Sequence, residues 1–233
     1  MTDARALRRG LAAASAGFAC GIIAAASAQQ PVARGSAPID LTGYWVSVVT
    51  EDWLWRMQTP PKGDYASVPL SAAGRGAADR WDPAVDDGTC RPFGAPALLR
   101  MPTRVRITWE NDSTLKLETD NGMQTRLLHF GEAPPSPAPS RQGSSAAEWS
   151  GSSLKVETTG LIPGYLRRNG VPYSAETTLT EHFVRHAAFG DEWFTVTTVV
   201  NDPQYLTQDF ITSSSFKKLP GATGWSPRAC EER

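Results

Sequence analysis

Apolar and charged residues alternate in many segments of the chain, which is the pattern of half-buried β-strands. The alternation is clearest in two similar stretches, 109–119 (WENDSTLKLET) and 149–158 (WSGSSLKVET). In each stretch a segment ending near a Trp leads into a polar turn and then into a second alternating segment. Each stretch therefore predicts an antiparallel pair of strands, and the two together predict a β-meander.

The same pattern predicts about nine or ten strands in all. The first runs over 41–57 with a bend before Trp53, and the others lie at 104–110, 114–120, 122–130, near Ala147, and at 154–159, 176–186, 192–200 and 206–218. Ser71 offers an N-cap for one short helix over 72–80. The proline-containing segments 133–140 and 160–174 are expected to be loops. These elements predict an all-β fold, an antiparallel up-and-down barrel of about 8–10 strands with one short helix or a related sandwich, since closure removes exposed sheet edges.

The N-terminus has the pattern of an export signal. Arginines precede an apolar run over 11–26 that is short for a membrane span, and Ala26-Ser27-Ala28 fits a signal peptidase site. We expect residues 1–28 to be a signal peptide cleaved after Ala28, 29–40 to be a flexible lead-in, and 41–233 to be one barrel domain. The pair Arg8-Arg9 leaves the twin-arginine route open. The expected location is the periplasm or the extracellular space, with no membrane segment in the mature chain.

Two cysteines remain after that cleavage, Cys90 and Cys230. An oxidising compartment favours a disulfide between them, and two unpaired buried thiols are the alternative. Removal of the leader also leaves a net charge of about −3, with both signs interspersed. This balance argues against nucleic acid as a partner, and against an anionic membrane surface.

The segment Leu41-Thr42-Gly43-Tyr44-Trp45 resembles the Gly-x-Trp signature of the calycin group, which includes the lipocalins. The resemblance implies that Trp45 points inward against the barrel floor, with a basic residue of a late strand, Arg185 or Lys217, lying over it. Elsewhere, and notably at 163–174 (PGYLRRNGVPYS), the chain is similar to uncharacterised secreted bacterial proteins, a likeness that implies no activity.

One face of the expected strand 176–186 carries candidate chemistry. Leu179, Glu181, Phe183 and Arg185 alternate on it, so Glu181 is a carboxylate between apolar neighbours. Such surroundings raise a carboxyl pKa toward general acid/base use, with Arg185 or Arg126 as a partner. The alternative is an ion pair that only fixes strand register.

One histidine is a second candidate for acid/base chemistry, and the spacing of the other two argues against a shared metal ion. His129, at a strand end, is a possible acid/base group, although a structural role is the ordinary one for a single histidine. His182 and His186 would lie roughly 13 Å apart on a strand, too far to share one ion. We expect no metal and no cofactor, and the sequence contains neither a nucleophile elbow nor a phosphate-binding glycine loop.

Aromatic residues gather near the first strand. Tyr44, Trp45, Trp53 and Trp55 could form the wall of a small-molecule cavity, with Arg126, Phe183 and Arg185 as further ligand-binding residues, or they could simply fill a core. In the 160–174 loop, Tyr165 could stabilise negative charge, and Arg167-Arg168 could meet an anionic ligand or remain a solvated pair.

Three functions follow from these candidates. The first is an exported barrel that binds a small, largely apolar or aromatic molecule in its interior. The second is a cofactor-free enzyme for isomerisation, hydration or cyclisation, with Glu181 or His129 as the acid/base and with Tyr165 or an arginine to stabilise developing negative charge. The third is a cell-envelope interaction module that uses exposed loops. The sequence does not choose among them, and it leaves the oligomeric state open.

Overall fold

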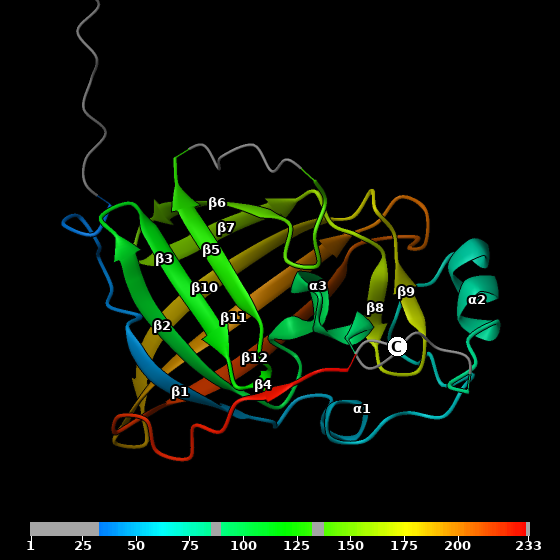
Figure 1. The fold of residues 1–233 in the computed structure, drawn as a ribbon, viewed down its shortest axis with the longest axis horizontal. Coiled ribbons are helices and arrows are strands. Elements are labelled where there is room, and N and C mark those ends of the chain that lie inside the picture. Colours follow the sequence, from blue (N-terminus) through cyan, green and yellow to red (C-terminus); the bar gives the residue numbers. More distant parts are fainter. Residues whose placement is uncertain (1–32, 85–89, 132–137, 232–233) are drawn as a thin grey trace, which may run out of the picture. The chain divides into compact units, whose positions relative to one another are not determined.

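The structure is a computed structural model that describes residues 33–84, 90–131 and 138–231. The predicted signal peptide and its cleavage site lie outside these residues. Nine of the strands close into a barrel in which neighbours in space follow one another in the chain (Figure 1). They are β1 (Gly43–Val48), β2 (Arg104–Asn111), β3 (Thr114–Thr119), β5 (Thr125–Phe130), β6 (Ser144–Ser150), β7 (Ser153–Thr159), β10 (Thr178–Ala188), β11 (Asp191–Asn201) and β12 (Phe210–Leu219). The prediction of an all-β up-and-down barrel is confirmed.

One strand pair departs from the expected antiparallel arrangement. β5 and β6 are parallel, whereas every other pair of neighbours in the barrel is antiparallel. Consecutive strands around a ring can all alternate in direction only if their number is even. A ring of nine strands must therefore contain a parallel pair, and here β5 and β6 form it.

The predicted hairpins of the repeated sequence are present as β2–β3 and β6–β7. Equivalent residues pair across them, Trp109 with Leu115 and Trp149 with Leu154. The ring of Phe130 lies between the two tryptophans, 5.6 Å from Trp109 and 4.9 Å from Trp149 between ring centroids. The described part of the lead-in is held in place here, because the Trp149 indole donates to the carbonyl of Ala33 at 2.9 Å.

Apolar side chains from all around the ring meet in the barrel core. Rings from the first, tenth, eleventh and twelfth strands contribute, and so do side chains from η1 (Arg91–Phe93) and α3 (Ala95–Leu98). Phe93 and Leu98 belong to this core although they precede β2 in the chain. A second cluster packs α2 (Ala72–Asp79) against β9 (Val171–Tyr173) and the end of β12.

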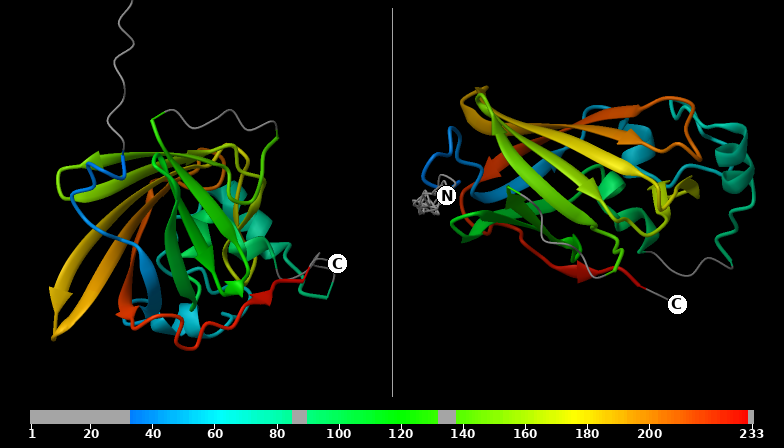
Figure 2. Two further views of the ribbon diagram at one scale, coloured as in Figure 1. Left: turned by 60° about the vertical axis from the view of Figure 1, so that its left-hand side comes forward. Right: turned by 90° about the horizontal axis from the view of Figure 1, so that it is seen from above.

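The short elements gather at one end of the barrel, as Figures 1 and 2 show. Besides η1, α2 and α3 they are α1 (Trp53–Met57) and the hairpin of β8 (Gly164–Arg167) and β9. We call this set the cap. A final strand, β13 (Arg228–Ala229), pairs in parallel with β4 (Asn121–Gly122). No helix within the described ranges is long and apolar enough to cross a membrane.

Two local predictions were wrong and one was confirmed. Trp53-Leu54-Trp55-Arg56 was expected to continue the first strand, but it forms α1, because Asp52 has a left-handed backbone (φ 51°) that ends the extended chain. The segment 160–174, expected to be a loop, holds the β8–β9 hairpin. α1 and α3 add to the single helix expected. That helix begins as predicted, since the Ser71 hydroxyl accepts a hydrogen bond from the Gly74 amide at 3.1 Å.

Candidate functional site

Glu181 lies inside the barrel and pairs with Arg126. Arg126 Nη2 lies 2.6 Å from Glu181 Oε2 and Nη1 lies 3.0 Å from Oε1, a two-point contact between side chains that are 0% and 1% exposed. Thr158 accepts a further bond from Arg126 at 3.2 Å. Of the two arginines that the sequence offered as partners, Arg126 makes the contact. The pair is thus almost completely shielded from solvent, although Arg126 Nε has no acceptor in the described structure.

Arg185 lies elsewhere. It forms an ion pair with Glu192 near the β10–β11 turn, and its side chain is 31% exposed. Because Arg185 already has a partner on the adjacent strand, it contributes nothing to the Glu181 contact. Glu181 and Arg185 share a face of β10, as the alternation indicates, but they lie four residues apart and do not contact each other.

The other candidate acid/base groups are not brought to Glu181. On β5 the inward residues are Arg126 and Leu128, so His129 belongs to the outward face, where its Nδ1 lies 3.3 Å from Thr114 Oγ1. Partial burial lowers the pKa of the His129 imidazole. Tyr165 lies in the β8–β9 hairpin, where its hydroxyl accepts a bond from Arg91 Nη1 at 3.1 Å.

The aromatic residues predicted as one wall are dispersed. Trp45 and Phe183 point into the barrel and are fully buried, whereas Tyr44 is only partly buried and packs edge-on against Trp225. Trp53 is 57% exposed on α1. Trp55, on the same helix, lies under the Arg167 guanidinium at 4.9 Å. The expectation that these residues line a common cavity is therefore not met.

The inward aromatic rings pack on one another. The Phe194 ring lies 4.9 Å from Trp45, 5.9 Å from Phe183 and 4.7 Å from Phe216, measured between centroids. All four rings have an exposure of 0%. Contacts at these distances are those of a packed aromatic core. The residues in question fill the barrel rather than line an open space.

The Trp45 side chain makes a hydrogen bond and a cation–π contact. Its indole donates to the carbonyl of Leu41 at 2.9 Å, and a cation covers the ring. That cation is Lys218, whose Nζ lies 5.3 Å from the ring centroid, and not Arg185 or Lys217. Lys218 covers the ring because it is the register partner of Trp45 on the neighbouring strand.

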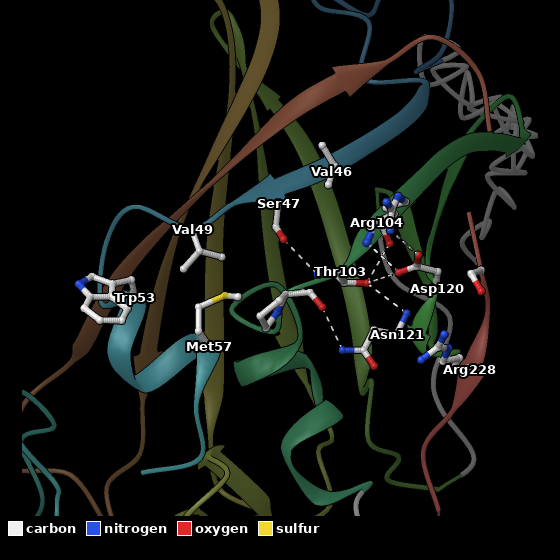
Figure 3. A pocket seen from close by; sticks show the side chains of 12 residues that line it. Val46, Ser47, Val49, Trp53, Met57, Thr103, Arg104, Asp120, Asn121 and Arg228 are labelled. Carbon is white, nitrogen blue, oxygen red and sulfur yellow. Dashed lines mark hydrogen bonds and ion pairs between the residues drawn. The ribbon is translucent and has the colours of Figure 1, made fainter. Parts of the chain in front are cut away.

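A groove of about 780 Å³ lies outside the core, between α1, the ends of β1 and β2, and the C-terminal segment (Figure 3). Its apolar part consists of Val46, Val49, Trp53, Met57 and Pro102. Trp53 is 57% exposed and Met57 is 54% exposed. Two large apolar side chains open to solvent within one hollow are the usual material of a binding surface.

The polar part of the groove contains two arginines and one carboxylate. Asp120 is buried and fully engaged, because it accepts bonds from the Thr103 hydroxyl at 2.9 Å and from the Arg104 amide at 2.7 Å. Arg104 Nη1 lies 3.6 Å from the other oxygen of Asp120. Arg228, from β13, is exposed at the rim. The two guanidinium groups against one carboxylate give this end of the groove a net positive charge.

A disulfide holds the C-terminal segment that carries Arg228 at the edge of the groove. Cys90 and Cys230 are bonded, with 5.0 Å between their Cα atoms across 140 residues of sequence, as the sequence predicts. Cys230 follows β13 directly, so the bond holds Arg228 beside β4. Sequence reasoning found the disulfide but did not identify Arg104, Asp120, Met57 or Arg228 as groove residues. The pairing of an early with a terminal cysteine was the available signal that the C-terminus helps to build a site.

The described residues contain no group of three or more His, Cys, Asp or Glu side chains arranged to hold a metal ion. Comparison of the chain with family models, with curated proteins and with solved structures found no match.

Proposed function

We propose that this chain is an exported β-barrel protein that binds a small amphiphilic anion, with an apolar or aromatic body, in the groove beside α1. The observation that carries the proposal is the combination, in one hollow, of exposed Trp53 and Met57 with the guanidinium groups of Arg104 and Arg228. Apolar side chains would cover the body of the ligand, and the arginines would hold its carboxylate or sulfonate.

The groove is a better site than the barrel interior, where the sequence suggests the ligand. A guest in the interior would have to separate rings that already contact one another around Phe194. Opening such a core costs several kcal/mol, on the order of a large-to-small core substitution. The groove is already open to solvent and requires no such rearrangement.

Export is part of the proposal. It is supported by the signal-peptide pattern of residues 1–28 and by the Cys90–Cys230 bond, because disulfides persist in the periplasm and outside the cell. A periplasmic or secreted location therefore agrees with both the signal-peptide pattern and the disulfide.

An acid/base enzyme is less well supported. Glu181 is 1% exposed and is held by Arg126, so a substrate would have to enter the packed interior before it could exchange a proton. His129 and Tyr165 lie apart from that pair. The geometry fits the register-fixing ion pair that the sequence offers as the alternative.

An interaction module is favoured by one specific observation. On α1 the exposed fractions are 57% for Trp53, 45% for Leu54 and 54% for Met57, a large apolar display for so short a helix. A protein partner would bury Leu54 together with the groove residues, whereas a small ligand in the groove need not touch Leu54.

A fluorescent aromatic sulfonate, 1-anilinonaphthalene-8-sulfonate, tests the groove. We expect binding by the folded, oxidised protein, about fivefold weaker for Arg228→Gln and about tenfold weaker for Trp53→Ser, from the loss of one charge-assisted hydrogen bond and of one apolar contact surface. Matched controls are Lys62→Gln and Val184→Ser, exposed residues outside the groove, which should bind normally.

An uncharged analogue, N-phenyl-1-naphthylamine, separates the two contributions. It should lose affinity in Trp53→Ser but not in Arg228→Gln. Equal binding of both dyes by wild-type protein and by both groove variants would overturn the proposal. A loss of dye binding in Leu54→Ser as large as in Trp53→Ser would favour the interaction module.

A further inference from the structure

Three buried arginines meet in the cap, away from the groove and from the Arg126–Glu181 pair. Arg56 comes from α1, Arg100 from the turn after α3, and Arg167 from β8, with exposures of 3%, 5% and 4%. Arg56 Nε donates to the carbonyl of Arg100 at 2.8 Å, which ties two of the three together. Arginine is almost never this deeply buried unless its charge is matched.

Two of these charges have carboxylate partners. Arg56 forms an ion pair with Glu51, and Arg100 Nη2 lies 3.0 Å from Asp52 Oδ2. The side chains of Glu51 and Asp52 are each 31% exposed. The cluster thus lies directly beneath the surface, and these two acids form its outer edge.

Arg167 has no carboxylate partner among the described residues. Its hydrogen bond goes to the neutral hydroxyl of Ser67, at 2.8 Å from Nη2, and its guanidinium lies over the Trp55 ring at 4.9 Å. Burial, together with the nearby charge of Arg100, lowers the pKa of Arg167 to about 10, and the charges of Asp52 and Asp64 only partly oppose this lowering. Arg168 adds a further cation, since its Nη2 donates to the carbonyl of Arg56 at 2.8 Å.

Four N–H-bearing atoms of the three arginines are buried without an acceptor in the described structure. They are Arg56 Nη2, Arg100 Nη1, and Nε and Nη1 of Arg167. A buried donor without an acceptor costs free energy, and a buried cation without an anion costs more. Excess positive charge and unused donors in one place are what an oxyanion satisfies.

We propose that Arg56, Arg100 and Arg167 form an enclosed binding site for a small oxyanion of the phosphate, sulfate or carboxylate type. The ligand would accept hydrogen bonds from the unused guanidinium donors and balance the charge of Arg167. Guanidinium suits such a ligand because it is planar, always charged and weakly hydrated. The site does not use the groove residues of α1, Trp53 and Met57, whose side chains are exposed whereas that of Arg56 is buried.

Thermal unfolding and calorimetric titration test the site with inorganic phosphate, sulfate and acetate. The protein is kept in Tris chloride, free of sulfonate buffers, and the ionic strength is held constant with sodium chloride. We expect at least one oxyanion to raise the unfolding temperature progressively with concentration, while chloride at equal ionic strength does not. Preference for phosphate or sulfate would indicate a tetrahedral ligand, and preference for acetate a carboxylate.

Arg167→Met is the decisive variant. Methionine can still cover Trp55, and it removes a charge that lacks a carboxylate, so the variant should be at least as stable as wild-type protein in chloride. Its binding of the stabilising oxyanion should be at least tenfold weaker. Lys62→Met, at an exposed residue outside both the groove and the arginine cluster, should bind the oxyanion normally. Arg167→Met should bind the aromatic sulfonate as tightly as wild-type protein, which separates this inference from the proposed function.

Two results would overturn the inference. One is an unfolding temperature that depends only on ionic strength and not on the anion. The other is a calorimetric affinity for the oxyanion that is the same in wild-type protein and in Arg167→Met. Arg167→Lys provides a further check, since it keeps the charge but loses the planar donors, and it should bind at an intermediate strength.

Discussion

At the scale of single residues, the Arg126–Glu181 pair should have the largest influence on stability. Glu181→Gln leaves Arg126 charged and unmatched in the core, so we expect the free energy of unfolding to fall by about 3–5 kcal/mol. Replacing both residues by Met should recover most of this loss, to within about 1–2 kcal/mol of wild type, because no buried charge remains. Urea unfolding of Arg126→Met, of Glu181→Met and of the double Met variant measures the coupling. Additive effects would contradict a purely paired role.

Tyr173 offers a second test at this scale, because its hydroxyl is buried without a partner in the described structure. Burial raises the pKa of Tyr173 to about 12, from its ordinary value of 10.0. The unfolded chain therefore loses this proton first, and the contribution of Tyr173 to stability falls as the pH rises from 10 toward 12. Tyr173→Phe should remove that decline and raise the free energy of unfolding at neutral pH by up to about 1 kcal/mol. Unfolding in denaturant at pH 7 and pH 10.5 measures both effects.

Residue positions within a strand could be predicted from the sequence, but their partners could not. Alternation along residues 176–186 correctly placed Leu179, Glu181 and Phe183 on the inward face. It offered both Arg126 and Arg185 as partners for Glu181, although Arg185 lies four residues along the same strand, roughly 13 Å away at about 3.3 Å per residue. That Arg126 faces Glu181 depends on the order of strands around the barrel, and alternation within one strand carries no information about that order.

At the scale of elements, two glycines in hairpin turns allow the cost of backbone strain to be measured apart from the cost of side-chain crowding. Gly170 in the β8–β9 turn has φ +79°, and a Cβ there would lie 2.2 Å from Trp81 Cγ. Gly151 in the β6–β7 turn has φ +59° with open space around it. Gly151→Ala should lower the free energy of unfolding by about 1 kcal/mol through left-handed strain alone. Gly170→Ala should lower it by about 3 kcal/mol or more, since the turn must also move away from Trp81. Equal losses in denaturant unfolding would show that the cap accommodates the methyl group.

Elements with clear alternation were predicted well, and elements stabilised by distant contacts were not. In the two repeated hairpins, a Trp, a short polar turn and an alternating segment follow one another at the same spacing, and this local pattern predicts the hairpin. Trp53-Leu54-Trp55-Arg56 has no alternation, and it becomes a helix through the reversal at Asp52 and the burial of Arg56 against Glu51. The β8–β9 hairpin likewise depends on packing in the cap, which proline and glycine content alone cannot reveal.

At the scale of the whole molecule, both candidate sites are assembled from segments that are far apart in the sequence. The groove combines residues near 50, 104, 120 and 228, and the arginine cluster combines residues near 56, 100 and 167. Barrel closure brings the ends of these segments to one end of the fold. Alternation along single strands therefore predicts the inward Glu181 but cannot predict the groove, whose residues come from several distant segments.

The Cys90–Cys230 bond connects this assembly to stability and to ligand binding. It closes a loop of 140 residues, for which the chain-entropy relation gives a stabilisation of up to about 5 kcal/mol. Cys90→Ser/Cys230→Ser should lower the free energy of unfolding by that amount or less, and it should also release β13 from β4. Because Arg228 moves with β13, binding of the aromatic sulfonate should weaken about fivefold, as in Arg228→Gln.

Oxyanion binding in the cap should persist wherever the variant stays folded, because Arg56, Arg100 and Arg167 lie outside the C-terminal segment. Dye and anion titrations of the oxidised protein and of the double serine variant, both below their unfolding temperatures, measure the difference. Unchanged dye affinity in the variant would show that β13 stays in place without the bond and that the groove does not depend on it.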